Sequence, residues 1–134
     1  MRKIFFKKLK KFILLKDIFD ICNYSNKKFY NKKIFEVKSI KDARTGDVTF
    51  FNDIKYEYDI KNTKASACIV NIKLLKYLNK KTIPIISQNP LLDFYKTVLL
   101  FYPESSFDNE DINILKKKKY IFKKKYSYWR KFFN

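Results

Sequence analysis

The chain has no histidine, one glycine and two cysteines among its 134 residues, and these shortages exclude several kinds of site. Cys22 and Cys68 stand far apart with no Cys-x-x-Cys pair, so neither a zinc cluster nor a cysteine–histidine nucleophile can be assembled. Cys68 lies in the apolar run ACIV, and we expect both thiols to be buried small groups in a reducing compartment. We therefore predict no metal, no cofactor and a cytoplasmic location.

Long apolar runs are also absent. The longest are FILL after Lys11 and VLLFY after Thr97, well short of the roughly 18 to 20 residues that a membrane-spanning helix needs. Residues 1–16 are basic with interleaved apolar residues, which suits an amphipathic helix on anionic lipid. We favour the alternative that residues 10–22 form the first helix of a folded domain. Its core-facing residues would be Phe12, Leu15, Ile18, Phe19 and Cys22.

The formal net charge of +18 has two competing explanations. Such a field attracts nucleic acid or an anionic membrane without specificity. The excess sits in lysine, however, in a chain also rich in Ile, Phe, Asn and Tyr, which is the composition that AT-rich codons produce at unconstrained positions. We favour this second explanation, so the charge alone is weak evidence for a partner.

The middle of the chain alternates strand-like and helix-like segments, which predicts an α/β fold. We expect a small mixed β-sheet of about four to five short strands flanked by helices. The expected strands are 34–40, 48–51, 67–70 and 82–86, and the expected short helices are 53–61 and 72–78. Gly46 should lie in a turn that needs a positive φ, and Pro84 should either place its strand at an edge or be the first paired residue of that strand.

The last predicted element is a helix over 90–102. Asn89 followed by Pro90 is a typical helix start, and Pro103 ends the element. The three-four spacing predicts an inward face made of Leu91, Leu92, Tyr95, Val98, Leu99 and Tyr102. Composition changes abruptly after Pro103, so we place a domain boundary near Glu104.

The most informative stretch is GDVTFFNDIKY, residues 46–56, in which Phe50, Asp53 and Tyr56 follow one another at three-residue intervals. Two aromatic rings around a polar residue can grip a flat base, and each stacked base is worth about 1 to 3 kcal/mol. TKASACIV at 63–70 and NPLLDFYKTVLLFYP at 89–103 follow in order. Together the three segments resemble the amino-terminal, non-repeat domain of UDP-3-O-acylglucosamine N-acyltransferase, the lipid A enzyme, from about Lys10 to Pro103.

This resemblance implies that Phe50 and Tyr56 stack on the uracil of a UDP-sugar while residue 53 hydrogen-bonds the base edge. The family has asparagine there, whereas Asp53 can accept from uracil N3–H but cannot donate to its carbonyl oxygens, so we expect weakened affinity. Asn52 is a substitute if the turn is shifted, and Lys55 is a candidate phosphate contact. From spacing alone, we would favour the alternative that Phe50 and Tyr56 are core aromatics beside a turn, and the three matched segments together reverse that preference.

The resemblance stops where the family's catalytic half should begin. That half is a left-handed β-helix of hexapeptide repeats with a catalytic histidine, and this chain has no histidine and no hexapeptide period after Pro103. We expect a chain truncated before the β-helix, without catalytic residues and inactive alone. Its organisation would be a basic arm (1–9), an α/β uridine-binding-like domain (10–103) and an unrelated basic, aromatic tail (104–134).

The expected partners are a UDP-sugar nucleotide and a separately encoded catalytic half, and the chain alone should be a monomer in the cytoplasm or at the inner-membrane surface. The alternative is a nucleic-acid or anionic-membrane binder that acts through its two ends. It would use the cations at 116–119, 123–125, 130 and 131 with the aromatic residues between them.

Overall fold

The structure of the chain is a computed structural model that describes residues 8–103. The expected tail over 104–134 and most of the expected arm over 1–9 lie outside the described residues. Within residues 8–103, no helix combines the length and the apolar character that crossing a membrane requires.

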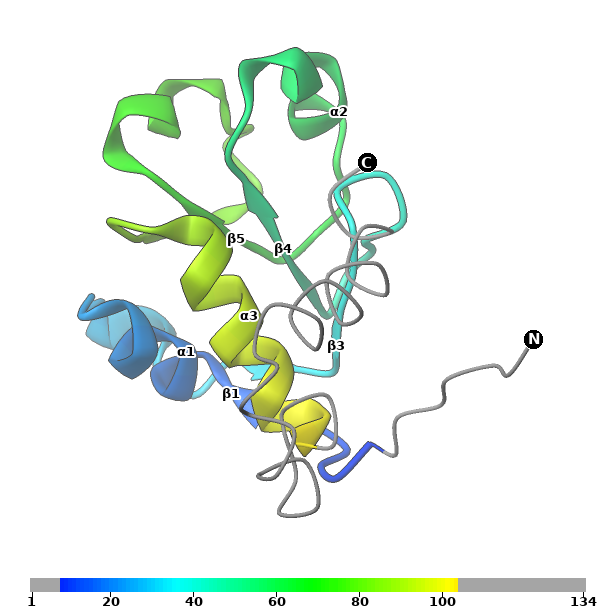
Figure 1. The fold of residues 1–134 in the computed structure, drawn as a ribbon, viewed down its shortest axis with the longest axis vertical. Helices are drawn as coiled ribbons and strands as arrows, with labels where there is room; N and C mark the ends of the chain where they lie inside the picture. Colours follow the sequence, from blue (N-terminus) through cyan, green and yellow to red (C-terminus); the bar gives the residue numbers. More distant parts are fainter. Residues whose placement is uncertain (1–7, 104–134) are drawn as a thin grey trace, which may run out of the picture.

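A four-stranded parallel sheet lies at the centre of the described residues (Figure 1). Its strands lie side by side in chain order: β3 (Glu36–Val37), β4 (Asp47–Phe51), β5 (Ala67–Val70) and β6 (Ile83–Ile86). Strand β5 is buried along its whole length, as expected of a parallel sheet covered on both faces. Strand β6 is an edge strand, as Pro84 predicts. The α/β fold class is confirmed.

A second, two-stranded antiparallel sheet pairs β1 (Ile13–Leu14) with β2 (Lys33–Ile34). The expected helix over 10–22 is therefore wrong in its first part, and α1 covers only Leu15–Cys22. The expected strand over 34–40 is also wrong as a single element, because β2 and β3 belong to different sheets. Both errors have one cause: Ile13 pairs with Ile34, a long-range partner that local spacing does not reveal.

Helices and turns cover the two faces of the parallel sheet. On one face lie α1 and α3 (Pro90–Phe101), side by side in Figure 1. The other face is covered by α2 (Glu57–Lys61) and the 3₁₀ segments η2 (Ile54–Tyr56) and η3 (Ile72–Tyr77). A further 3₁₀ turn, η1 (Lys27–Phe29), precedes β2. The helix expected over 53–61 is therefore the 3₁₀ turn η2 followed by the short α-helix α2, whereas the helix expected over 72–78 is the 3₁₀ segment η3.

The core consists of two apolar clusters, one on each face of the sheet. The α1/α3 cluster packs Phe19, Phe94 and Phe101 against the strands. The α2/η3 cluster packs Phe51, Ile60, Cys68 and Val70, with half-buried side chains from η3 around them. Side chains alternate along a strand, so the neighbours Phe50 and Phe51 belong to different clusters. Cys22 and Cys68 are both buried and unpaired, as predicted.

Helix α3 begins as predicted, with the Asn89 side chain accepting a hydrogen bond from the backbone N–H of Leu92 at 3.3 Å. Its predicted inward face is only partly correct: Val98 is buried and Tyr95 and Tyr102 pack against the core, whereas Leu91 and Leu92 are exposed. The buried residues of the helix are Pro90, Asp93, Phe94, Thr97, Val98 and Phe101. Apolar residues at three-four spacing form two overlapping stripes on this helix, and the larger phenylalanine rings take the buried one.

Gly46 has a φ of 95°, as its position in the turn predicts. A Cβ atom there would lie 3.2 Å from Cδ2 of Phe35, so space as well as backbone conformation favours glycine. The N–H of Gly46 donates to Oγ of Ser66 at 2.7 Å, which ties the turn before β4 to the start of β5.

Candidate functional site

The predicted site residues lie in and just after β4, where the strand ends and η2 begins. Asp53 shapes this turn. One of its carboxylate oxygens accepts a hydrogen bond from the backbone N–H of Lys55 at 3.0 Å, and its carbonyl accepts from Tyr56 N–H at 3.1 Å. An aspartate forms this cap as well as an asparagine does. Asn52, Asp53 and Lys55 are exposed.

Phe50 belongs to the α1/α3 cluster. Its ring centroid is 4.6 Å from that of Phe94, with 34° between the ring planes, and the residue is only 7% exposed. This is the geometry of a core aromatic pair.

Tyr56 is half-buried against the α2/η3 cluster, on the other face of the sheet. The ammonium nitrogen of Lys55 lies 5.1 Å from its ring centroid, a cation–π contact. The rings of Phe50 and Tyr56 therefore do not face each other, contrary to the expectation. Side chains alternate along β4, so Phe50 points to the α1/α3 face and Phe51 to the other face. The chain after β4 lies over that second face, and Tyr56 packs there.

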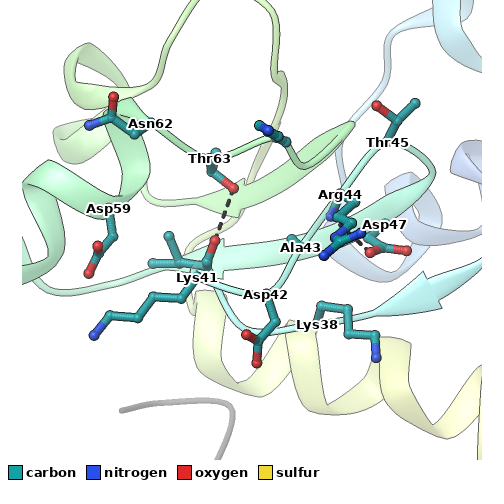
Figure 2. Close-up of a pocket in the computed structure, with 12 residues that line it drawn as sticks. Lys38, Lys41, Asp42, Ala43, Arg44, Thr45, Asp47, Asp59, Asn62 and Thr63 are labelled. Atoms are coloured by element: carbon teal, nitrogen blue, oxygen red, sulfur yellow. Dashed lines mark hydrogen bonds between the residues drawn. The ribbon is translucent and has the colours of Figure 1, made fainter.

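A separate groove of about 1010 Å³ lies between the loop that leads into β4 and the segment that connects α2 to β5 (Figure 2). Its walls are joined where the hydroxyl of Thr63 donates to the carbonyl of Ile40 at 3.1 Å, the dashed bond of Figure 2. The side-chain amide of Asn79 fixes the same segment by donating to the carbonyls of Ile60 and Thr63, each at 3.3 Å.

The groove carries four cationic side chains, those of Lys38, Lys41, Arg44 and Lys64. None of the four forms an ion pair with another residue of the 8–103 range, where the ion pairs are Lys8–Glu36 and Lys61–Glu57. Its aspartates offset part of this charge. Asp42 accepts from the Ser39 hydroxyl at 3.2 Å and Asp47 from the Arg44 N–H at 2.9 Å, so both also hold the loop in shape.

Sequence reasoning missed this groove. Its residues come from separate loops with no shared motif, so no local pattern in the sequence indicates it. Sequence reasoning also missed the buried hydrogen bond between Ser87 and Asp93, two residues that lie 6 positions apart on either side of the start of α3. A charged residue in the first turn of a largely apolar helix was the available signal for that pair.

The profile of a known family, described as UDP-3-O-(3-hydroxymyristoyl) glucosamine N-acyltransferase, LpxD, matches residues 31–100, which is just over half of the chain. The chain belongs to the LpxD family. The matched range includes the turn after β4, the whole parallel sheet and nearly all of α3.

Individual relatives agree with the LpxD assignment. The UDP-3-O-acylglucosamine N-acyltransferases of Rickettsia bellii and Rickettsia prowazekii are 33% and 32% identical to this chain over 69 residues. That of Rickettsia felis is 33% identical over 76 residues. Each match covers 52% of this chain, and the chain spans only about a fifth of the length of these curated relatives. The cations and rings of the alternative, nucleic-acid or membrane-binding interpretation lie outside the described residues, and the comparisons give it no support.

Proposed function

We propose that this chain is a UDP-sugar-binding domain of the kind that begins the lipid A N-acyltransferase, with its uridine site at the turn after β4. One observation carries the proposal: the family match over residues 31–100 contains the complete aromatic–polar–aromatic turn. The relatives' names describe enzymes that act on UDP-3-O-acylglucosamine, a nucleotide sugar, and that ligand class is what the turn would bind.

In this proposal Tyr56 is the first contact with the base, because part of its ring surface is exposed and its position is fixed by η2. Phe50 packs on Phe94 on the opposite face of the sheet, so in this proposal it supports the end of β4 from behind and the base stacks on one ring only. One stacked ring contributes about 1 to 3 kcal/mol, which is less than a two-ring clamp would give.

Asp53 accepts from uracil N3–H while it continues to hold the N–H of Lys55, since a carboxylate has lone pairs for both. Asn52 is exposed beside it and supplies the donor that a carboxylate lacks. The Lys55 ammonium, already placed over the Tyr56 ring, then contacts the first phosphate as a mobile point charge.

Acyl transfer would come from elsewhere. The residues of this chain include no histidine for the general-base step that the family resemblance implies, so we assign them the binding of the nucleotide sugar and no acyl transfer. We propose that the isolated chain is a monomer and that it acts in the cytoplasm, at or near the inner membrane.

Calorimetric titration with UDP-N-acetylglucosamine tests the proposal. The wild-type chain should bind, and Tyr56→Ala should weaken binding at least about fivefold, because the loss of one stacked base costs about 1 to 3 kcal/mol. Tyr58→Ala is the matched control, because Tyr58 is 79% exposed on the adjoining helix and should leave the affinity unchanged. Asp53→Asn should strengthen binding by restoring an amide donor. Equal losses from Tyr56→Ala and Tyr58→Ala, or no wild-type binding, would contradict the proposal.

A further inference from the structure

A second, smaller cavity of about 390 Å³ lies where the end of α1, the end of β6 and the start of α3 meet. It shares no lining residue with the turn after β4 or with the basic groove. Cys22 and Asn23 line it from the end of α1, Ile86 and Gln88 from the end of β6, and Asp93 and Lys96 from α3. Its volume falls in the range of about 300 to 1,000 Å³ that small-ligand sites occupy.

A nearly buried carboxylate lies at this cavity. Asp93 is 9% exposed, and one of its oxygens accepts a hydrogen bond from the hydroxyl of Ser87, itself 2% exposed. The same hydroxyl oxygen accepts from the backbone N–H of Asn89 at 3.0 Å, which leaves its proton for Asp93. The carboxylate is therefore held in one position by the backbone at the start of α3.

The thiol of Cys22 lines the same cavity as this carboxylate. Burial, reinforced by the charge of nearby Asp93, raises the pKa of Cys22 to about 12. The thiol therefore keeps its proton at neutral pH. Within residues 8–103, the side-chain donor to Asp93 is the neutral hydroxyl of Ser87.

No residue of the 8–103 range forms an ion pair with Asp93. Lys96 lines the same cavity but is not within ion-pair distance of the carboxylate. A carboxylate offers about four lone-pair positions, and a buried charge is costly unless an opposite charge accompanies it. The cavity therefore holds a fixed anion with acceptor capacity left over and room for a cation beside it.

The geometry points to a binding site for a small organic ammonium ion, whose N–H groups donate to Asp93 while its hydroxyl or amide groups meet the side chains of Asn23 and Gln88. Ile86 provides an apolar wall for the carbon atoms of the ligand. Lys96, of like charge, opposes such a ligand and limits its affinity.

Ethanolamine is the test ligand, and ethylene glycol is its matched neutral control because it replaces the ammonium with a hydroxyl. In a titration of the full chain followed by amide chemical shifts, ethanolamine should move the signals of Asn23, Gln88 and Asp93. The signals of residues 53–56 should stay in place. Ethylene glycol should move none of them. Equal shifts with both ligands, or no shift at these residues with ethanolamine, would overturn the assignment.

Two variants sharpen the test. Asp93→Asn keeps the shape and the Ser87 contact but removes the charge, so ethanolamine affinity should fall about tenfold or more. Lys96→Met removes the opposing cation and keeps the apolar stem, so affinity should rise by about two- to fivefold. Lys96 is exposed, so that variant remains informative if Asp93→Asn does not fold. Unchanged affinity in either folded variant would count against the site.

Discussion

At the residue scale, Thr49 is the one place in residues 8–103 where a buried side-chain oxygen has no hydrogen-bond partner. It lies in the middle of β4, fully buried, beside Cys68 of β5. A hydroxyl buried without a partner costs about 1 to 3 kcal/mol. The β-branched shape of threonine suits the strand, but its buried hydroxyl lacks the hydrogen-bond partner that it needs.

Thr49→Val should therefore stabilise the fold by about 1 kcal/mol, because valine keeps the branched shape and removes the unpaired oxygen. Urea unfolding followed by circular dichroism measures the change. Thr97→Val is the matched control: Thr97 is equally buried, but its hydroxyl donates to the carbonyl of Asp93 at 2.8 Å. That variant should gain nothing or lose stability. Destabilisation by Thr49→Val would show that its hydroxyl has a partner.

The two thiols make stability depend on pH at the alkaline end. Burial raises the pKa of Cys22 to about 12, and burial also raises the pKa of Cys68. A group whose pKa is higher in the folded chain than in the unfolded chain makes its full contribution to stability at pH values below its pKa in the unfolded chain. That contribution is lost as pH rises towards the folded pKa.

Stability should fall from about pH 9 upwards, by at most about 1.4 kcal/mol per pH unit for each thiol. Cys22→Ala should reduce the slope between about pH 9 and pH 12 by up to about 1.4 kcal/mol per pH unit, because the variant has no thiol at this position to ionise. Unfolding in urea at several pH values measures both slopes. Identical slopes for wild type and Cys22→Ala would mean that Cys22 ionises alike in both states.

At the element scale, α3 is the helix whose start was predictable and whose face was not. The pair Asn89-Pro90 fixes where it begins, since one side chain caps it and the proline ring suits its first turn. Leucines and aromatic rings occur on more than one side of α3, so spacing alone does not decide which of two apolar stripes is buried. Contact with α1 and β4, which no local pattern encodes, decides that Phe94 and Phe101 are buried.

Phe94→Ala should cost about 3 to 5 kcal/mol, because it empties a fully buried site between α1 and β4. Leu92→Ala, on the same helix but 44% exposed, should change the free energy of unfolding by no more than about 0.5 kcal/mol. The two variants are compared by urea unfolding. If Leu92→Ala lowered the free energy of unfolding more than Phe94→Ala, the inward face predicted from the sequence spacing would be the correct one.

The strands show the same division between local and long-range information. Strand β5 and the turn at Gly46 follow from an apolar run and a lone glycine, which are local signals. The β1–β2 pair joins residues about twenty positions apart, and its strands are only two residues long. Such short pairs leave no periodic pattern, so the first helix was predicted too long.

At the scale of the whole molecule, the sequence motif locates the turn but not the arrangement of its rings. Asp53 and Tyr56 are held in place by η2, whereas Phe50 is committed to the core on the opposite face. A spacing of three residues suggests a common side only in a continuous helix, and here a strand ends and a 3₁₀ turn begins between them. The basic groove and the Asp93 cavity are also properties of the assembled fold.

The most direct measurement is a set of nuclear Overhauser contacts between UMP and the isotope-labelled chain. The account predicts contacts from the uracil H5 and H6 protons to the ring of Tyr56, while the Phe50 ring signals stay in place because that ring packs on Phe94 on the other face of the sheet. UMP that binds with contacts only to other residues, or that does not bind at millimolar concentration, would contradict a uridine site at this turn.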